Sequence, residues 1–130
     1  MNNNLIKEFL NKKNIFAVVG VSKNPEKYGH QVYQDLKKEG YKVYPINPNA
    51  NEILGNKCYS KLSELPTTPD IVNIVVPPKI TKEILKECKE LGINKIWMQS
   101  GSENQEAIDY CIKNKIKYLE NVCIIKNKIK

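Results

Sequence analysis

The chain of 130 residues contains no arginine, because all 21 of its basic residues are lysines. Arginine makes the bidentate contacts with guanine that dominate base recognition, so its absence argues against a nucleic-acid partner. The formal net charge of +7 does not reverse this, because residues 112–130 hold six lysines and one glutamate. A basic terminal segment is typically a solvated end. A modest basic field would still attract an anionic small ligand.

Long apolar runs are also lacking. None approaches the roughly 18 residues of a membrane-spanning helix, and the first residues show neither the apolar core nor the cleavage site of a secretory signal. We therefore expect a cytoplasmic protein without a membrane association.

Paired cysteines are missing as well. Cys58, Cys88, Cys111 and Cys123 stand 30, 23 and 12 residues apart, which matches neither a zinc pattern nor a redox pair. The one histidine, His30, is expected at the surface or in a helix cap. We expect reduced, structural cysteines and no metal site. For Cys123, either a packed thiol or an exposed one able to form a mixed disulfide with a thiol ligand fits the sequence.

Strand-like and helix-like segments alternate along a chain whose length fits one domain, residues 1–130. Strands are expected at 15–20, 42–46, 71–76, 95–99 and 117–119, with a last extended stretch at 122–125. Helices are expected at 5–11, 28–39, 61–65 and 80–91, and from an N-cap at Ser102 to residue 114. The alternation predicts an α/β fold, a Rossmann-like parallel sheet of about five strands with helices on both faces.

The segment from Asn14 to Asn24 carries the strongest functional signal. An apolar run ends at Gly20, and small and polar residues then lead to a helix near Tyr28. A parallel strand delivers a turn to a helix N-terminus in this way, and backbone N–H groups there favour a phosphate. Lys23 and Lys27 either meet the phosphate charge or are solvated loop residues, and the sequence leaves both open.

The expected strand ends share a composition of small, proline and amide residues. Because carboxyl ends of parallel strands meet at one edge of the sheet, these segments predict a nucleotide site there. They are Gly20-Val21-Ser22, Asn47-Pro48, Val76-Pro77-Pro78, Gln99-Ser100-Gly101 and Asn121-Val122-Cys123.

The common nucleotide motifs do not fit. Val21 and Ser22 follow Gly20 where a GxGxxG turn would have its second glycine, and no GxxxxGK[ST] motif is present. Strand two leads into Asn47 and Pro48 instead of the acidic residue that binds ribose in NAD domains. NAD is therefore disfavoured, and so is ATP hydrolysis.

Six segments in order resemble the small, stand-alone CoA-binding domain proteins, relatives of the nucleotide-binding domain of the succinyl-CoA synthetase alpha subunit. They are VVGVSKNPEKYG, GYKVYPINP, ILGNKCYSKLSELP, DIVNIVVPP, IWMQSG with a following QEA, and Cys123. The resemblance covers roughly residues 14–125. It implies a Rossmann-like fold that binds coenzyme A or an acyl-CoA.

The resemblance also implies roles by position. A phosphate would be held by Gly20, Val21, Ser22 and Lys23 with Tyr28 beside it, and Lys57 would be a further phosphate contact. The adenosine end would be bordered by Asn47 and Pro48. The rest of the cofactor would pack along Val76, Pro77 and Pro78, then along Gln99, Ser100 and Gly101, with Cys123 at the rim of the site. Ser100 departs from the family, where an apolar residue is frequent. So does the segment before Cys123, where relatives often have Asp-Arg.

The sequence shows no nucleophile–base pair, metal set or acid–base pair, so we expect a non-enzymatic CoA-binding protein. Three alternatives remain open at this point. One is an NAD(H)-binding redox-sensing module, and another is a subunit that supplies the CoA site to a partner acyl-CoA ligase. The third is an enzyme that turns over an acyl-CoA thioester. The identity of any protein partner is open.

Overall fold

The computed structural model describes residues 3–120 and 122–127. Its main sheet contains β1 (Ile15–Val19), β2 (Lys42–Ile46), β5 (Ile71–Ile74), β6 (Lys95–Met98) and β7 (Lys117–Glu120). All neighbouring strands are parallel, in the order β2-β1-β5-β6-β7. The predicted Rossmann-like parallel sheet is confirmed. The strand order reverses between β1 and β5, and ligands of such sheets bind at this reversal.

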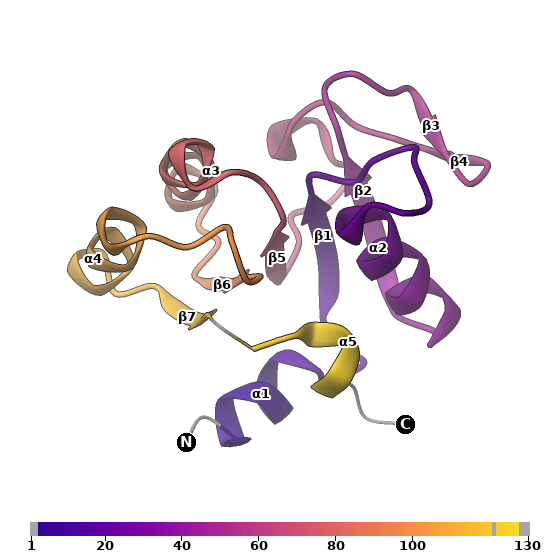
Figure 1. Ribbon diagram of the computed structural model, residues 1–130. Helices are drawn as coiled ribbons and strands as arrows, with labels where there is room; N and C mark the ends of the chain where they lie inside the picture. The colour runs from indigo at the N-terminus through magenta and orange to yellow at the C-terminus, as the bar shows by residue number, and fades with distance from the viewer. Residues whose placement is uncertain (1–2, 121, 128–130) are drawn as a thin grey trace.

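Helices cover both faces of this sheet (Figure 1). On one face lie α1 (Asn3–Phe9), α2 (Tyr28–Lys38) and α5 (Ile124–Asn127), and on the other lie α3 (Pro78–Glu90), α4 (Gln105–Lys113) and the 3-10 helix η1 (Leu62–Glu64). Strand residues alternate between the two layers: Phe16 and Val18 pack towards α2, whereas Ala17 and Val19 pack towards α3. This double burial explains why the strands are almost continuously apolar.

A small hairpin stands apart from the main sheet. Its strands, β3 (Glu52–Ile53) and β4 (Asn56–Lys57), pair antiparallel around Leu54 and Gly55. Both turn residues have positive φ, 50° and 78°. The sequence predicted only a loop here, because leucine rarely adopts the left-handed region that this turn requires.

Two further expectations for single elements are wrong. Ser102 does not cap α4; Asn104 does, and its Oδ1 accepts a hydrogen bond from the Ala107 N–H at 2.8 Å. The stretch at 122–125 is not a strand, because α5 begins at Ile124, whose side chain is buried against the α2 layer. Burial in the core outweighs the strand preference of this β-branched segment.

Two negative findings hold for the described residues. Within residues 3–120 and 122–127, no helix is long and apolar enough to cross a membrane. In the same part of the chain, no three histidine, cysteine or acidic residues gather in the way a metal ion requires.

Candidate functional site

Two glycines bring the end of β1 and the start of α2 into close contact. Gly20 has φ +103°, and a Cβ there would overlap the carbonyl oxygen of Val75. A Cβ on Gly29, in the first turn of α2, would overlap the carbonyl oxygen of Gly20. The absence of side chains at both positions therefore lets the helix N-terminus sit directly against the strand end, at the point where the strand order reverses.

The first turn of α2 suits an anion. Lys27 is the N-cap, its side chain makes no capping hydrogen bond, and the first turn contains no acidic residue. The N–H groups and the positive end of the helix dipole are thus left for another partner. Lys23 and Lys27 are exposed on the loop before the helix. Ser22 is half-buried, and its Oγ accepts a hydrogen bond from the Asn24 N–H at 3.0 Å.

His30 holds the loop at residues 22–27 through a hydrogen bond to its first residue. The expected surface position is wrong, because His30 is 3% exposed. Its Nδ1 lies 2.7 Å from the carbonyl oxygen of Ser22. Since a carbonyl only accepts hydrogen bonds, Nδ1 carries the proton and donates it. The histidine thereby holds the loop against the helix that follows.

Asn47 braces the ends of β1 and β2. Its Nδ2 donates to the carbonyl oxygen of Val21 at 2.7 Å, and its Oδ1 accepts from the Asn49 N–H at 2.8 Å. Both ends of the side-chain amide are therefore engaged within the protein. The neighbouring Pro48 is exposed beside them.

A hydrogen-bonded network joins α2 to the ends of β5, β6 and β7. The Tyr28 hydroxyl donates to Gln99 Oε1 at 3.0 Å, and Gln99 Nε2 donates to Asn73 Oδ1 at 2.6 Å. Cys123 Sγ lies 2.7 Å from the same hydroxyl. Because the single phenol proton goes to Gln99, the thiol is the donor in this contact. The Ile124 N–H also donates to Gln99 Oε1, at 3.2 Å.

Burial, more than the network, keeps the Tyr28 phenol protonated. Burial raises the pKa of the Tyr28 phenol well above its usual range, and the hydrogen bond with the Cys123 thiol raises it further. Cys123 itself is half-buried, and none of the four cysteines forms a disulfide in the described residues. Asn121, expected with Val122 and Cys123 at the end of the last strand, lies outside the described residues.

The ends of β5 and β6 are joined through Ser102. Its Oγ accepts a hydrogen bond from the Val76 N–H at 3.0 Å, and its carbonyl oxygen accepts one from Thr81 Oγ1 at 2.6 Å. Pro77 caps α3 and Pro78 is its first residue. Pro77, Ser100 and Gly101 are exposed, so this side of the site presents accessible surface.

Lys57 lies at the edge of the sheet, apart from the other predicted site residues. Its Nζ lies 5.1 Å from the centroid of the Tyr59 ring. Together with Lys37 and Val43 it lines a hollow of about 270 Å³ along the edge of β2. The structure therefore places Lys57 beside the sheet edge, whereas the other predicted residues follow the strand ends.

Three residues that shape the site were missed by the sequence predictions. Gly29 gives a weak signal as a glycine at the start of a helix, and Asn73 as the one polar residue in an otherwise apolar strand. Asn73 is fully buried, and its Nδ2 has no hydrogen-bond partner among the described residues. Ser102 was noticed, but only as a helix cap.

Comparison with known proteins identifies the family. The family model described as "CoA binding domain" matches residues 14–128. The chain belongs to this CoA-binding domain family. The resemblance inferred from the six sequence segments is thereby confirmed.

Some relatives are larger than this chain. The alpha subunit of the ADP-forming acetate–CoA ligase II of Pyrococcus furiosus is 43% identical over 86 residues, which is 65% of this chain and 19% of that subunit. The chain thus spans about a fifth of that relative. The uncharacterised protein YneT of Bacillus subtilis is 32% identical over 92% of this chain and 88% of its own length.

Solved structures show the same architecture. A conserved hypothetical protein from Pyrococcus furiosus is 41% identical, with a TM-score of 0.85 over 88% of this chain and 99% of that protein. A hypothetical protein from Pyrococcus horikoshii is 31% identical, with a TM-score of 0.91 over 98% of this chain and 89% of that one.

Proposed function

We propose that this protein, as a single CoA-binding domain, binds coenzyme A or a short acyl-CoA at the carboxyl ends of its parallel strands, without transforming it. One observation carries the proposal: Gly20 and Gly29 allow the first turn of α2, which lacks a side-chain cap, to lie against the end of β1. Family membership and the CoA ligases among the relatives support coenzyme A as the nucleotide.

The chemistry of the residues at these strand ends fits that ligand. N–H groups of the α2 first turn, Ser22 and the loop lysines Lys23 and Lys27 would hold a phosphate of coenzyme A. Pro48 and the backbone near Asn47 would border the adenosine. The turn at Val76, Pro77 and Pro78, in which Pro77 is exposed, would supply apolar contact to the chain of the cofactor, with Ser100 and Gly101 next to it. Lys57 is a phosphate contact only if the ligand reaches the edge of β2.

Binding without turnover is supported by the hydrogen bonding and protonation of the polar side chains at the strand ends. Tyr28, Gln99, Asn73 and Cys123 hydrogen-bond to one another. The raised pKa of Tyr28 keeps its phenol from acting as a base at neutral pH. Acetyl-CoA incubated with the protein should therefore stay intact, and release of free coenzyme A at a protein-dependent rate would contradict this part of the proposal.

An NAD(H)-binding module is the less favoured function. An NAD site uses a carboxylate at the end of β2 to bind the ribose hydroxyls. Here Asn47 has no charge, and both ends of its amide already bond to Val21 and Asn49. A role as the CoA-site subunit of a partner ligase would use the same binding site and is compatible with the proposal.

The first test is isothermal titration of the reduced protein with coenzyme A, acetyl-CoA, NAD, NADH and ATP in parallel. Selective binding of coenzyme A or acetyl-CoA, with a dissociation constant on the order of micromolar, is expected. Binding of NADH without coenzyme A would instead assign the protein to the redox-sensing alternative.

The site itself is tested by Ser22→Trp. A bulky indole at this half-buried position should fill the turn and weaken coenzyme A binding by at least about tenfold, equivalent to 1.4 kcal/mol. Thr68→Trp is the matched control, because Thr68 is exposed in the loop that leads into the amino end of β5, at the opposite edge of the sheet. Wild-type affinity in a folded Ser22→Trp variant would place the phosphate elsewhere.

A further inference from the structure

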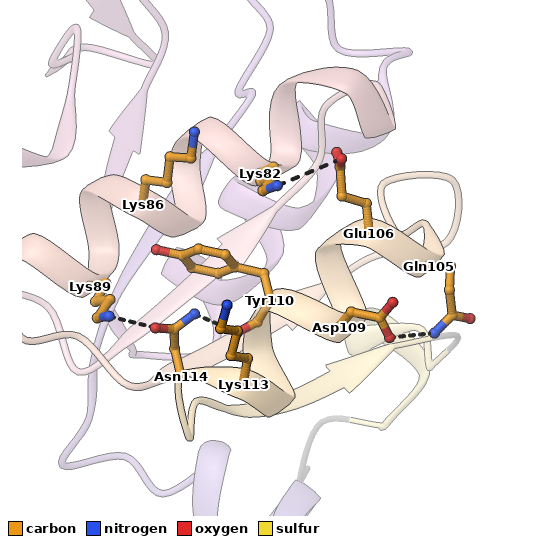
Figure 2. A pocket seen from close by; sticks show the side chains of 9 residues that line it. All are labelled: Lys82, Lys86, Lys89, Gln105, Glu106, Asp109, Tyr110, Lys113 and Asn114. Atoms are coloured by element: carbon orange, nitrogen blue, oxygen red, sulfur yellow. Dashed lines mark hydrogen bonds and ion pairs between the residues drawn. The ribbon is translucent and has the colours of Figure 1, made fainter.

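A second concave surface lies between α3 and α4, outside the candidate CoA site (Figure 2). It is a groove of about 720 Å³. We call it the α3–α4 groove; its lining residues are Lys82, Lys86, Lys89, Gln105, Glu106, Asp109, Tyr110, Lys113 and Asn114. None of these residues takes part in the network at the strand ends.

The α3 wall of the groove is a row of cations. Lys82, Lys86 and Lys89 recur at i, i+4 and i+7, so they lie on one face of the helix. At 1.5 Å of rise per residue, the row extends about 10 Å along the helix axis. The three ammonium groups are therefore strung out in a line, which suits an elongated anionic segment better than a single phosphate.

The α4 wall is mixed in charge. Glu106 pairs with Lys82 at 3.6 Å, and Asp109 accepts a hydrogen bond from Gln105 at 2.8 Å. Four lysines against these two carboxylates leave a local charge of +2. Lys113 has no ion pair or hydrogen bond with any residue that the structure describes, and Lys86 pairs only with the exposed Glu83, at 3.5 Å.

The floor of the groove offers an aromatic surface. Tyr110 is half-buried, and Figure 2 shows its ring in the space between the two helices. Asn114 closes one end, where its carbonyl accepts a hydrogen bond from Lys89 and its amide donates to the Tyr110 carbonyl. An occupant would thus meet cations on one side and an aromatic face beneath.

We propose that the α3–α4 groove docks an acidic segment of a partner protein, with its carboxylates against Lys82, Lys86 and Lys89. Charge complementarity with the α3 wall favours an anionic occupant. A nucleic-acid backbone fits less well, because Glu106 and Asp109 would repel its evenly spaced phosphates, whereas a peptide can place its carboxylates on the α3 side and donor side chains on the α4 side. In the ligase alpha subunit of Pyrococcus furiosus, of which this chain spans about a fifth, the related domain is accompanied by much additional protein.

The test uses a fluorescent, alanine-rich helical peptide of about four turns with glutamates at i, i+4 and i+7. Its binding to the full chain is followed by fluorescence anisotropy at low salt. The variant Lys86→Glu/Lys89→Glu should weaken binding at least about tenfold, or 1.4 kcal/mol. Lys13→Glu/Lys61→Glu is the matched control, because it changes the net charge equally at exposed positions outside the groove.

Several outcomes would overturn the proposal. Equal weakening by both double variants would indicate general charge attraction, and tighter binding of an oligodeoxythymidine through the same lysines would indicate a nucleic-acid site. Amide chemical shifts of the wild-type protein should change along 82–89 and 105–114 on peptide addition; changes centred elsewhere, or none, would also refute it. Coenzyme A affinity should be equal in the wild-type protein and in Lys86→Glu/Lys89→Glu, so this result is separate from the proposed CoA site.

Discussion

Gly29 determines how closely α2 approaches the end of β1. An alanine Cβ at this position would overlap the Gly20 carbonyl oxygen, which belongs to rigid backbone. We expect Gly29→Ala to lower the free energy of unfolding by about 1–3 kcal/mol, as overpacking does. It should also displace the first turn of α2 and reduce coenzyme A affinity, measured by chemical denaturation and calorimetry.

Gly55→Ala provides the control for this prediction. Gly55 has φ +78° in the β3–β4 turn, and nothing lies within 4 Å of a Cβ built there. The same substitution should cost only the strain of a left-handed alanine, about 1 kcal/mol, and leave coenzyme A affinity unchanged. Equal effects of both variants on affinity would show that close packing of α2 is not what shapes the site.

The residues at the strand ends were largely predictable, but their contacts were not. Gly20, Ser22 and Gln99 could be placed because the end of an apolar run marks the end of a strand. The contact of Tyr28 with Cys123 joins residues 95 positions apart, and no local pattern encodes such a pair. His30 was misplaced for a related reason, since the fold of the loop at 22–27 decides its burial.

At the scale of elements, the N-terminus of α4 is stabilised by the side chain of its N-cap residue, Asn104. The Asn104 side chain accepts the Ala107 N–H at 2.8 Å. Asn104→Ala should lower the free energy of unfolding by about 1 kcal/mol, whereas Asn104→Ser, which can cap equally well, should be nearly neutral. Urea denaturation of both variants measures this, and similar losses in the two would argue against capping as the cause.

Elements with strong periodicity were predicted within a few residues, and those held only by tertiary contacts were not. β2 was expected at 42–46 and lies at Lys42–Ile46. The apolar segment after β7 was expected to be extended, but it returns to the α2 layer as α5 and buries Ile124. Its β-branched residues predict a strand, but such residues are also used where a segment packs into the core without joining a sheet.

At the scale of the whole molecule, buried thiols make stability sensitive to alkali. Burial raises the pKa of the Cys111 thiol from 9.0 to about 11. Above pH 9 the thiol loses its proton in the unfolded chain but keeps it in the folded one. The free energy of unfolding is therefore undiminished below pH 9 and falls as the pH rises towards 11. A shift of this size corresponds to about 3 kcal/mol in total.

This alkaline loss can be isolated with Cys111→Ala. Denaturation followed by circular dichroism should show wild-type stability falling between about pH 8 and pH 10, by about 1 kcal/mol more than that of the variant. The comparison concerns the pH dependence, because the substitution also alters packing. Buried Cys88, whose pKa burial also raises, should leave a residual decline in the variant. Identical pH profiles would show that Cys111 ionisation does not contribute.

Parallel pairing on two covered faces was predictable at this scale, but strand order was not. Alternating strands and helices predict a layered α/β sheet. Any order of such apolar strands would bury similar surface, so only the structure shows that β1 lies between β2 and β5. Polar residues at the strand ends could therefore be assigned to one edge, but not to neighbouring positions along it.

The indole N–H of Trp97 donates to the Val122 carbonyl oxygen at 2.8 Å. This is the only tryptophan in the chain, and Val122 directly precedes the cysteine that touches Tyr28. A ligand that moved the segment after β7 would alter the surroundings of this single chromophore. The protein thus carries an intrinsic optical reporter, which would allow binding to be observed in unlabelled material.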